Sequence, residues 1–581
     1  MDLIVLGVLG AAVVVAVNAL APRLRVPAAL VLVVVGVAVS LIPAVPAIEI
    51  DPEWILAGVL PPLLYSTSVS MPAMDFRRDL TTIGGLSVAL VVLSSVALGW
   101  LVTLAVPGIG LATGIALGAI LSPTDAVATG ITRRLGVSPR VVTVLEGESL
   151  LNDASALVLL RSAIAATAAT VSLWHVVGDF LYAVVVAVVI GAVVGQVSMR
   201  VRGRLSDPHL TTAISFIVPF LAYLPAEHLG ASGLVAAVTA GLVTGYGSAK
   251  HLRPADRLSE TANWRTLELL LEGGVFLLMG LQVYGLVVDV RAEHGSVVRA
   301  MVVGVVAGLV VIVVRAAYVA PLLWALHRRA ARGPAVKDYL ATLETRLDEG
   351  GPARPTRPGP TPTPAVAQAR SSELRRRITR RVADIDYLAA APLGWREGAV
   401  LVWAGMRGVV TLAAAQSLPP ETPQRSLLVL IAFVVAVGTL LVQGLTLPWL
   451  VRVLGLVGRD EGTEADERAR LVDELDARAV ALLDDPDLRR PDGRPYDEAV
   501  LARARRALGD TRADLAEAAP SDQVEEPPTR QFRELRLAVI AAQRAELLHA
   551  RSLGVFSSAG LNRALAVLDA DQMSTELRSD S

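Results

Sequence analysis

The sequence predicts an all-α polytopic membrane protein with about 13 transmembrane helices and a helical cytoplasmic tail. Of its 581 residues, 53% are hydrophobic and only 18% are charged, a balance typical of membrane proteins. Apolar runs of about 20 residues, each long enough to span the hydrocarbon core, recur as far as residue 456. We therefore divide the chain into a transmembrane domain, 1–456, and a charged C-terminal domain, 457–581.

Basic residues set the expected orientation. Arg23, Arg77, Arg200 and Arg328 belong to loops that alternate with loops nearly free of Lys and Arg. The positive-inside rule then places the N-terminus outside and the C-terminus in the cytoplasm of a plasma (inner) membrane. The expected spans are 2–20, 27–47, 55–73, 81–106, 111–131, 141–168, 174–198, 209–227, 229–248, 264–290, 296–326, 396–418 and 426–455.

A long cytoplasmic segment, about 328–395, separates the last two spans from the others. Its centre, 350–364, is rich in Pro and Gly and cannot pack a core, so we expect a flexible loop there. Charged stretches on either side predict short helices. The tail predicts amphipathic helices, whose spacing favours a packing or dimer-supporting role over ligand binding.

Several functional classes are excluded. The chain has no cysteine, which rules out disulfides, thiolate metal sites and thiol catalysis. Its net charge of −1 gives no sign of a nucleic-acid partner. The histidines show no metal-ligand spacing, and no Ser-His constellation lies within the spans. We therefore expect neither an enzyme nor a bound cofactor.

Two predicted spans are interrupted where they also carry a charge. Leu-Ser-Pro-Thr-Asp (121–125) breaks the fifth span beside Asp125, and Gly-Met-Arg-Gly (405–408) breaks the twelfth at Arg407. Broken helices of this kind are typical of transporter sites. An odd offset of seven spans means antiparallel passage, as an inverted repeat requires. Asp125 would compensate the positive N-terminal ends of the half-helices, and Arg407 the negative C-terminal ends.

The span at 141–168 holds three carboxylates in a stretch otherwise suited to lipid: Glu146, Glu148 and Asp153. A charge at the bilayer centre costs about 2.5–3.5 kcal/mol or more, so such residues are typical of ion or proton pathways. Helical spacing places Ser149 and Asp153 on one face, with Glu148 and Asn152 on the next. These oxygens suit Na⁺, K⁺ or a proton, and one carboxylate can bind either in turn.

Two assignments complete this reading. Arg315 either snorkels to the interface or pairs with a carboxylate such as Glu148, and pairing is the more economical account. Glu146 stays unassigned, nearest the cytoplasmic entrance. A channel would need a continuous polar pore, whereas these charges cluster at one place, which favours a carrier.

Four segments in this order resemble the sodium/proton exchanger branch of the monovalent cation:proton antiporters. They are Leu-Ser-Pro-Thr-Asp-Ala-Val-Ala (121–128), Leu-Glu-Gly-Glu-Ser-Leu-Leu-Asn-Asp-Ala (145–154), Gly-Met-Arg-Gly (405–408) and Val-Gln-Gly-Leu-Thr-Leu-Pro (442–448). The resemblance implies exchange of Na⁺, or of Li⁺ or K⁺, for H⁺ by a homodimer in lipid. It also implies alternating access and a role in pH and sodium homeostasis.

Carried over by position, the resemblance implies a role for each site residue. Asp153 would alternate between proton and cation, Asn152 would orient it, and Asp125 would balance the helix ends. Na⁺ would bind at Asp153, Ser149 and Thr124. Glu148 would form a structural ion pair, for which we choose Arg315, and Arg407 matches the buried arginine of the second broken helix.

One segment departs from the family pattern. Prokaryotic relatives often read Pro-Pro-Leu-Leu-Phe-Glu in the third span, with the glutamate near the ion. Here the segment reads Pro-Pro-Leu-Leu-Tyr-Ser and ends at Ser66, so that carboxylate is missing. Ser66 is left as a possible neutral contact to the ion, and the choice between Na⁺ and K⁺ stays open.

Overall fold

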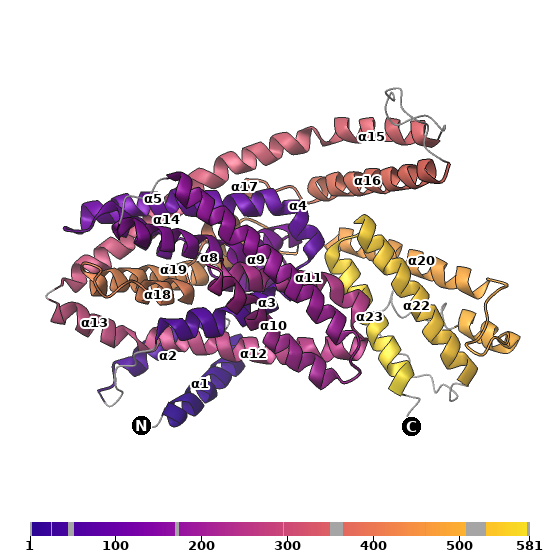
Figure 1. Cartoon of the computed structure of the whole chain (residues 1–581), viewed down its shortest axis with the longest axis horizontal. Coiled ribbons are helices and arrows are strands. Elements are labelled where there is room, and N and C mark those ends of the chain that lie inside the picture. The colour runs from indigo at the N-terminus through magenta and orange to yellow at the C-terminus, as the bar shows by residue number, and fades with distance from the viewer. Residues whose placement is uncertain are drawn as a thin grey trace. The chain divides into compact units, whose positions relative to one another are not determined.

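Helices make up the regular structure of this protein. The computed structural model describes residues 3–24, 26–43, 51–168, 173–293, 295–348, 364–458, 461–506 and 530–577, and these residues contain no strand. They form two units (Figure 1). The first comprises Met1–Leu252, Asp256–His327 and Leu393–Gly458, and the second Arg253–Ala255, Arg328–Pro392 and Arg459–Ser581. The predicted cytoplasmic segment thus groups largely with the C-terminal residues.

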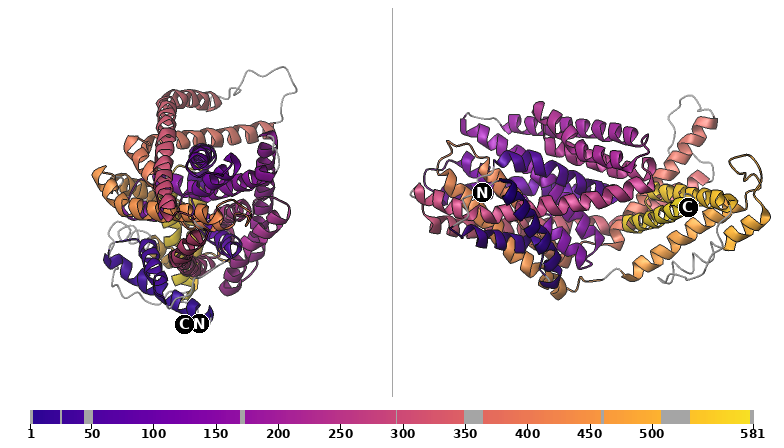
Figure 2. Two further views of the ribbon diagram at one scale, coloured as in Figure 1. Left: turned by 90° about the vertical axis from the view of Figure 1, so that its left-hand side faces the viewer. Right: turned by 90° about the horizontal axis from the view of Figure 1, so that it is seen from below.

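The first unit is a bundle whose helices run side by side (Figure 2). Its helices are α1 (Leu3–Leu24), α2 (Ala28–Ser40), α3 (Leu60–Ser70), α4 (Ala73–Gly84), α5 (Leu90–Ala105), α6 (Leu111–Leu121), α7 (Val127–Arg134), α8 (Pro139–Ala168), α9 (Leu173–Arg202), α10 (Pro208–His228), α11 (Gly233–His251), α12 (Pro254–Leu281), α13 (Val283–Ala292), α14 (Val297–Ala331), α17 (Trp395–Trp403), α18 (Val409–Gln416) and α19 (Arg425–Val453), with π-helical turns η1 (Trp54–Val59) and η2 (Gly85–Ala89).

Seven helical segments among the described residues are long and apolar enough to cross a membrane, and shorter apolar helices accompany them. The total of thirteen spans stays a prediction. One expected boundary is wrong, because residues 74–80 are helical rather than a loop and α4, η2 and α5 form a continuous segment, Ala73–Ala105. The reason is burial of charge: Asp79 is 1% exposed and pairs with Arg140 of α8 at 2.9 Å.

Glycines set the closest helix contacts in this bundle. At Gly36 of α2 an added Cβ would lie 2.4 Å from the carbonyl oxygen of Leu277, and at Gly280 of α12 it would lie 2.4 Å from that of Val33. Real Cβ atoms do not approach oxygen so closely. Small residues at such crossings let helix backbones touch, which is a main source of packing energy in membranes.

The second unit is built from charged, amphipathic helices. They are α15 (Gly333–Asp348), α16 (Pro364–Ala390), α20 (Glu461–Leu483), a short helix at 498–506, α22 (Arg530–Leu553) and α23 (Ser558–Leu577). Leu535 and Ile540 of α22 are buried, as the helical spacing of the tail predicts. Arg380 of α16 donates hydrogen bonds of 3.1 and 2.6 Å to the carbonyl oxygen of Ser552 in α22.

Candidate ion-binding site

The two predicted breaks are present in the structure. α6 ends at Leu121, because Pro123 has no N–H to continue the helix and its ring clashes with the preceding turn. The chain resumes as α7 at Val127. In the second broken helix, α17 ends at Trp403, the backbone between Gly405 and Gly408 is not helical, and α18 starts at Val409.

The two non-helical segments touch each other. The backbone N–H of Asp125 donates to the carbonyl oxygen of Met406 over 2.8 Å. In return, Nε of Arg407 donates to the carbonyl oxygen of Leu121 over 2.8 Å. The N–H of Arg407 also bonds to Oγ1 of Thr439 in α19 at 3.0 Å. The crossing therefore satisfies backbone groups that the breaks leave exposed in a non-aqueous interior.

Each charge at the crossing lies at helix ends of the opposite polarity. The Asp125 carboxylate accepts a hydrogen bond of 2.8 Å from the N–H of Val127, the first residue of α7, and it also lies at the N–H of Val409 in α18. The Arg407 guanidinium reaches the carbonyl oxygens of Leu121, where α6 ends, and of Gly405. This arrangement offsets the partial charges of the half-helix ends.

Helix α8 brings the polar side chains of its buried face to the first break. Ser149 donates to the carbonyl oxygen of Thr124 over 3.1 Å, and Nδ2 of Asn152 donates to Oγ1 of Thr124 over 2.6 Å. Ser149, Asn152 and Thr124 therefore form one network. Both lone pairs of the Ser149 hydroxyl and one of the Thr124 hydroxyl stay available to a cation.

Asp153 lies beside this network with unused hydrogen-bonding capacity. Its side chain is 4% exposed, and its Oδ1 has no hydrogen-bond partner among the described residues; the same holds for Oδ1 of Asn152. Asp125 lies within electrostatic range of Asp153. Buried polar atoms are almost always paired, so unpaired acceptors of this kind indicate a place for a proton or a cation.

Glu148 pairs with an arginine, and its Oε1 also accepts a hydrogen bond of 3.5 Å from Oγ1 of Thr124. Nη2 of Arg315 in α14 lies 2.7 Å from Oε2 of Glu148, and Nη1 bonds to Oε1, so the pair is bidentate. Nε of Arg315 donates to the carbonyl oxygen of Leu401 over 2.7 Å. The two side chains are 2% and 1% exposed. Glu148 is therefore already occupied by a cationic partner, unlike Asp153.

Comparison with known proteins identifies the family of this chain. A family model described as the transmembrane sodium/hydrogen exchanger matches residues 8–453. The chain belongs to the sodium/hydrogen exchanger family. It is 31% identical to an uncharacterized Na⁺/H⁺ exchanger of Mycobacterium tuberculosis, over 98% of this chain and 96% of that protein. It is 26% identical to the Na⁺/H⁺ antiporter ApNhaP of Aphanothece halophytica, over 93% of this chain and 92% of that one.

A solved structure shares the fold of this exchanger. The sodium proton antiporter MjNhaP1 of Methanocaldococcus jannaschii superimposes with a TM-score of 0.54 at 14% identity, over 78% of this chain and 98% of that one. At such low identity the likeness concerns the helical fold alone. Together with the family match, it makes this chain a membrane transporter of the antiporter family rather than an enzyme.

Sequence reasoning missed one carboxylate of the exchanger near this region. Ser66 is 6% exposed in α3, and Glu268 of α12 interacts with its hydroxyl. About two and a half turns beyond Glu268 in α12, Leu277 abuts α2. One turn before Glu268, Trp264 packs against Tyr65 with ring centroids 5.5 Å apart. Glu268 falls in the first turns of the predicted span 264–290. The helical spacing of Trp264 and Glu268 was the signal that put them on one face.

Two further buried ion pairs were also missed. Arg202, which lies beyond the end of the predicted span 174–198, has a fully buried side chain paired with Glu260. Asp79 likewise pairs with Arg140, which lies 61 positions later in the sequence. Their partners lie about sixty residues away in sequence, and no local pattern links such residues.

Proposed function

We propose that this exchanger carries Na⁺ inward or outward in exchange for H⁺, with Li⁺ and K⁺ as alternative cations, by alternating access across the plasma membrane. The observation that supports it most is the buried Asp153 carboxylate with an unpartnered Oδ1 beside Ser149, Asn152 and Thr124. A proton and a cation compete for this one carboxylate. Release of one is therefore coupled to binding of the other, which serves pH and sodium homeostasis.

Reconstitution in liposomes tests the proposal. Purified protein is placed in vesicles that contain a pH-sensitive dye and carry an imposed proton gradient. Addition of Na⁺ is expected to dissipate the gradient, and Li⁺ and K⁺ are compared under the same conditions. Vesicles that respond to none of the three cations contradict the proposal.

Cation choice depends, in our proposal, on the region around Ser66. Several relatives are named Na⁺/H⁺ antiporters, whereas one from Bacillus pumilus, 28% identical over 46% of this chain, is named a sodium, potassium, lithium and rubidium/H⁺ antiporter. We infer that Glu268 supplies a carboxylate where the third span offers Ser66. A Glu268→Gln variant whose Na⁺ to K⁺ preference matches the parent protein contradicts that role.

Gly408→Ala is expected to reduce exchange without unfolding the protein. A Cβ at this position would lie 1.5 Å from Oδ2 of Asp125, so the carboxylate has to leave the end of α18. Overpacking of this kind costs about 1–3 kcal/mol, and the same free energy added to a rate-limiting transport step lowers the transport rate by about 5- to 150-fold. The rate of cation-driven dye response measures it. Gly438→Ala in α19, where a Cβ meets nothing within 4 Å, is the matched control and should transport normally.

The same proposal covers the arrangement in the membrane. We infer that the protein is a homodimer. Residues 1–456 form the transport domain, and within them the segment 328–395 lies in the cytoplasm. Residues 457–581 are also cytoplasmic, and the N-terminus lies outside. Exposed apolar side chains such as Val185, Val189 and Val193 of α9 fit lipid or a second copy. Because the chain has no cysteine, labelling of a single cysteine introduced at either terminus shows on which side of the membrane that terminus lies. A detergent-corrected mass of one chain contradicts the dimer.

A further inference from the structure

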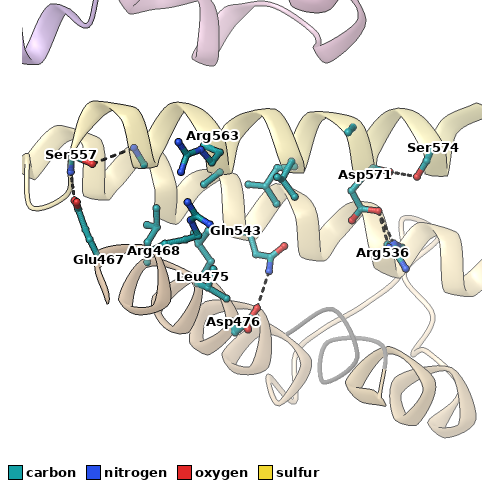
Figure 3. A pocket seen from close by; sticks show the side chains of 17 residues that line it. Glu467, Arg468, Leu475, Asp476, Arg536, Gln543, Ser557, Arg563, Asp571 and Ser574 are labelled. Carbon is teal, nitrogen blue, oxygen red and sulfur yellow. Dashed lines mark hydrogen bonds and ion pairs between the residues drawn. The ribbon is translucent and has the colours of Figure 1, made fainter. Parts of the chain in front are cut away.

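The second unit contains a groove between three of its helices (Figure 3). α20 and α23 both pack against α22 and leave a cavity of about 580 Å³ between them. Ligand pockets for small molecules have volumes of about 300–1,000 Å³. The groove is large enough for an organic ligand, and nothing in the transport chemistry of the first unit uses it.

The floor of the groove is aliphatic. Leu471, Leu475 and Leu568 are buried side chains that line it, and Ala564 and Val567 of α23 complete it. Among the residues that the structure describes, no aromatic side chain lines the cavity. A nucleotide base or other aromatic ring would lack a stacking partner here, whereas a flexible hydrocarbon chain would bury apolar surface against these side chains.

Two arginines give one end of the groove a positive charge. Arg468 of α20 and Arg563 of α23 both line the cavity and lie toward its Ser557 end (Figure 3). Neither forms an ion pair within the portion of the chain that the structure describes. The nearby carboxylate of Glu467 is already engaged by the N–H of Ser557 and closes the corner between the two helices. These two guanidinium groups are therefore available to an anion.

The other end of the groove carries no excess of positive charge. Arg536 bonds to Oδ1 of Asp571 at 2.7 Å, and Gln543 donates to Oδ1 of Asp476 at 3.5 Å (Figure 3). An excess of positive charge thus lies at the Ser557 end only, where two arginines accompany the single carboxylate of Glu467, with an aliphatic surface beside it. This polarity matches a ligand with an anionic head and an apolar tail.

We propose that the groove between α20, α22 and α23 binds an amphipathic anion with a single aliphatic chain, of the fatty-acid class. The head group lies between Arg468 and Arg563, and the chain lies along Leu471, Leu475 and Leu568. A carboxylate and a phosphate monoester on such a chain share this chemistry. The proposal is independent of the transport mechanism, since it concerns a different unit of the protein.

A fluorescent reporter in the full-length protein tests it. The chain has no cysteine of its own, so Ser574→Cys, at a residue that lines the groove, places one environment-sensitive dye there. The labelled protein is reconstituted in lipid nanodiscs and titrated with dodecanoate, dodecyl phosphate, dodecanol and inorganic phosphate. Saturable signals are expected from the two dodecyl anions, and the stronger of the two identifies the head group. Dodecanol and phosphate alone should give none.

Two variants test whether the arginines of the groove bind the anionic head group. Arg468→Gln combined with Arg563→Gln is expected to weaken dodecanoate binding by about tenfold or more, the loss expected when charge-assisted hydrogen bonds are removed. Arg470→Gln, on the same helix but outside the groove lining, should bind as the parent protein does. Equal binding of dodecanol and dodecanoate, an unchanged affinity in the double variant, or no saturable signal overturns the proposal. Unaltered thermal unfolding of the double variant shows that it is folded.

Discussion

Asp153→Asn is expected to abolish cation-driven proton movement completely. The carboxylate is buried at 4% exposure, and its Oδ1 has no partner among the described residues. Asparagine keeps the shape of the side chain but can neither take up a proton nor offer a negative charge to a cation. The dye response in proteoliposomes should therefore fall to that of protein-free vesicles for Na⁺, Li⁺ and K⁺ alike.

A second aspartate serves as matched control. Asp179 of α9 is exposed, and Asp179→Asn makes the same chemical change far from the broken helices. It should exchange cations at the parent rate. Exchange by Asp153→Asn at the level of this control would mean that a different group carries the proton, and the site would have to be reassigned.

Arg315→Ala is expected to produce the largest loss of stability. Removing it leaves the Glu148 carboxylate, 1% exposed, without its bidentate partner, and it also leaves the carbonyl oxygen of Leu401 unbonded. Breaking a buried ion pair from one side costs about 3–5 kcal/mol. We expect a strongly lowered thermal unfolding midpoint in detergent, and much less protein recovered from the membrane.

A double-mutant cycle separates the ion pair from simple loss of packing. Arg315→Ala with Glu148→Gln should recover part of the stability, because no buried charge is then left unpaired. The comparison pair is Arg161 and Glu227, whose side chains are 56% and 23% exposed at 2.7 Å. Breaking that pair should cost less than about 1 kcal/mol. Equal losses at both pairs would argue against a structural role for Glu148.

Local sequence pattern predicts much of this fold. Pro123 and the glycines at 405 and 408 end and restart helices by their own backbone chemistry, so the breaks can be located without tertiary information. Helical periodicity likewise separates Asp153 from Glu148. The bidentate contact between Glu148 and Arg315 is the pairing that the sequence suggested as the economical one.

Contacts between distant segments could not be predicted in the same way. Nothing near Asp79 in the sequence indicates that Arg140 of another helix neutralises it, because the two residues are 61 positions apart. The approach of Glu268 to Ser66 depends on how α12 is rotated against α3, which the apolar composition of both helices leaves undetermined. The groove of the second unit depends on the splay of two helices and has no sequence signature.

The hydrogen bond from Asp125 to Met406 has a consequence for biosynthesis. The first broken helix is translated long before the second, and until Met406 and Arg407 are inserted, no guanidinium donates a hydrogen bond to the carbonyl oxygen of Leu121. The proposed ion-binding residues of the first half therefore lack these two contacts until that point. Cation affinity should arise in a single late step, once the twelfth predicted span has entered the membrane.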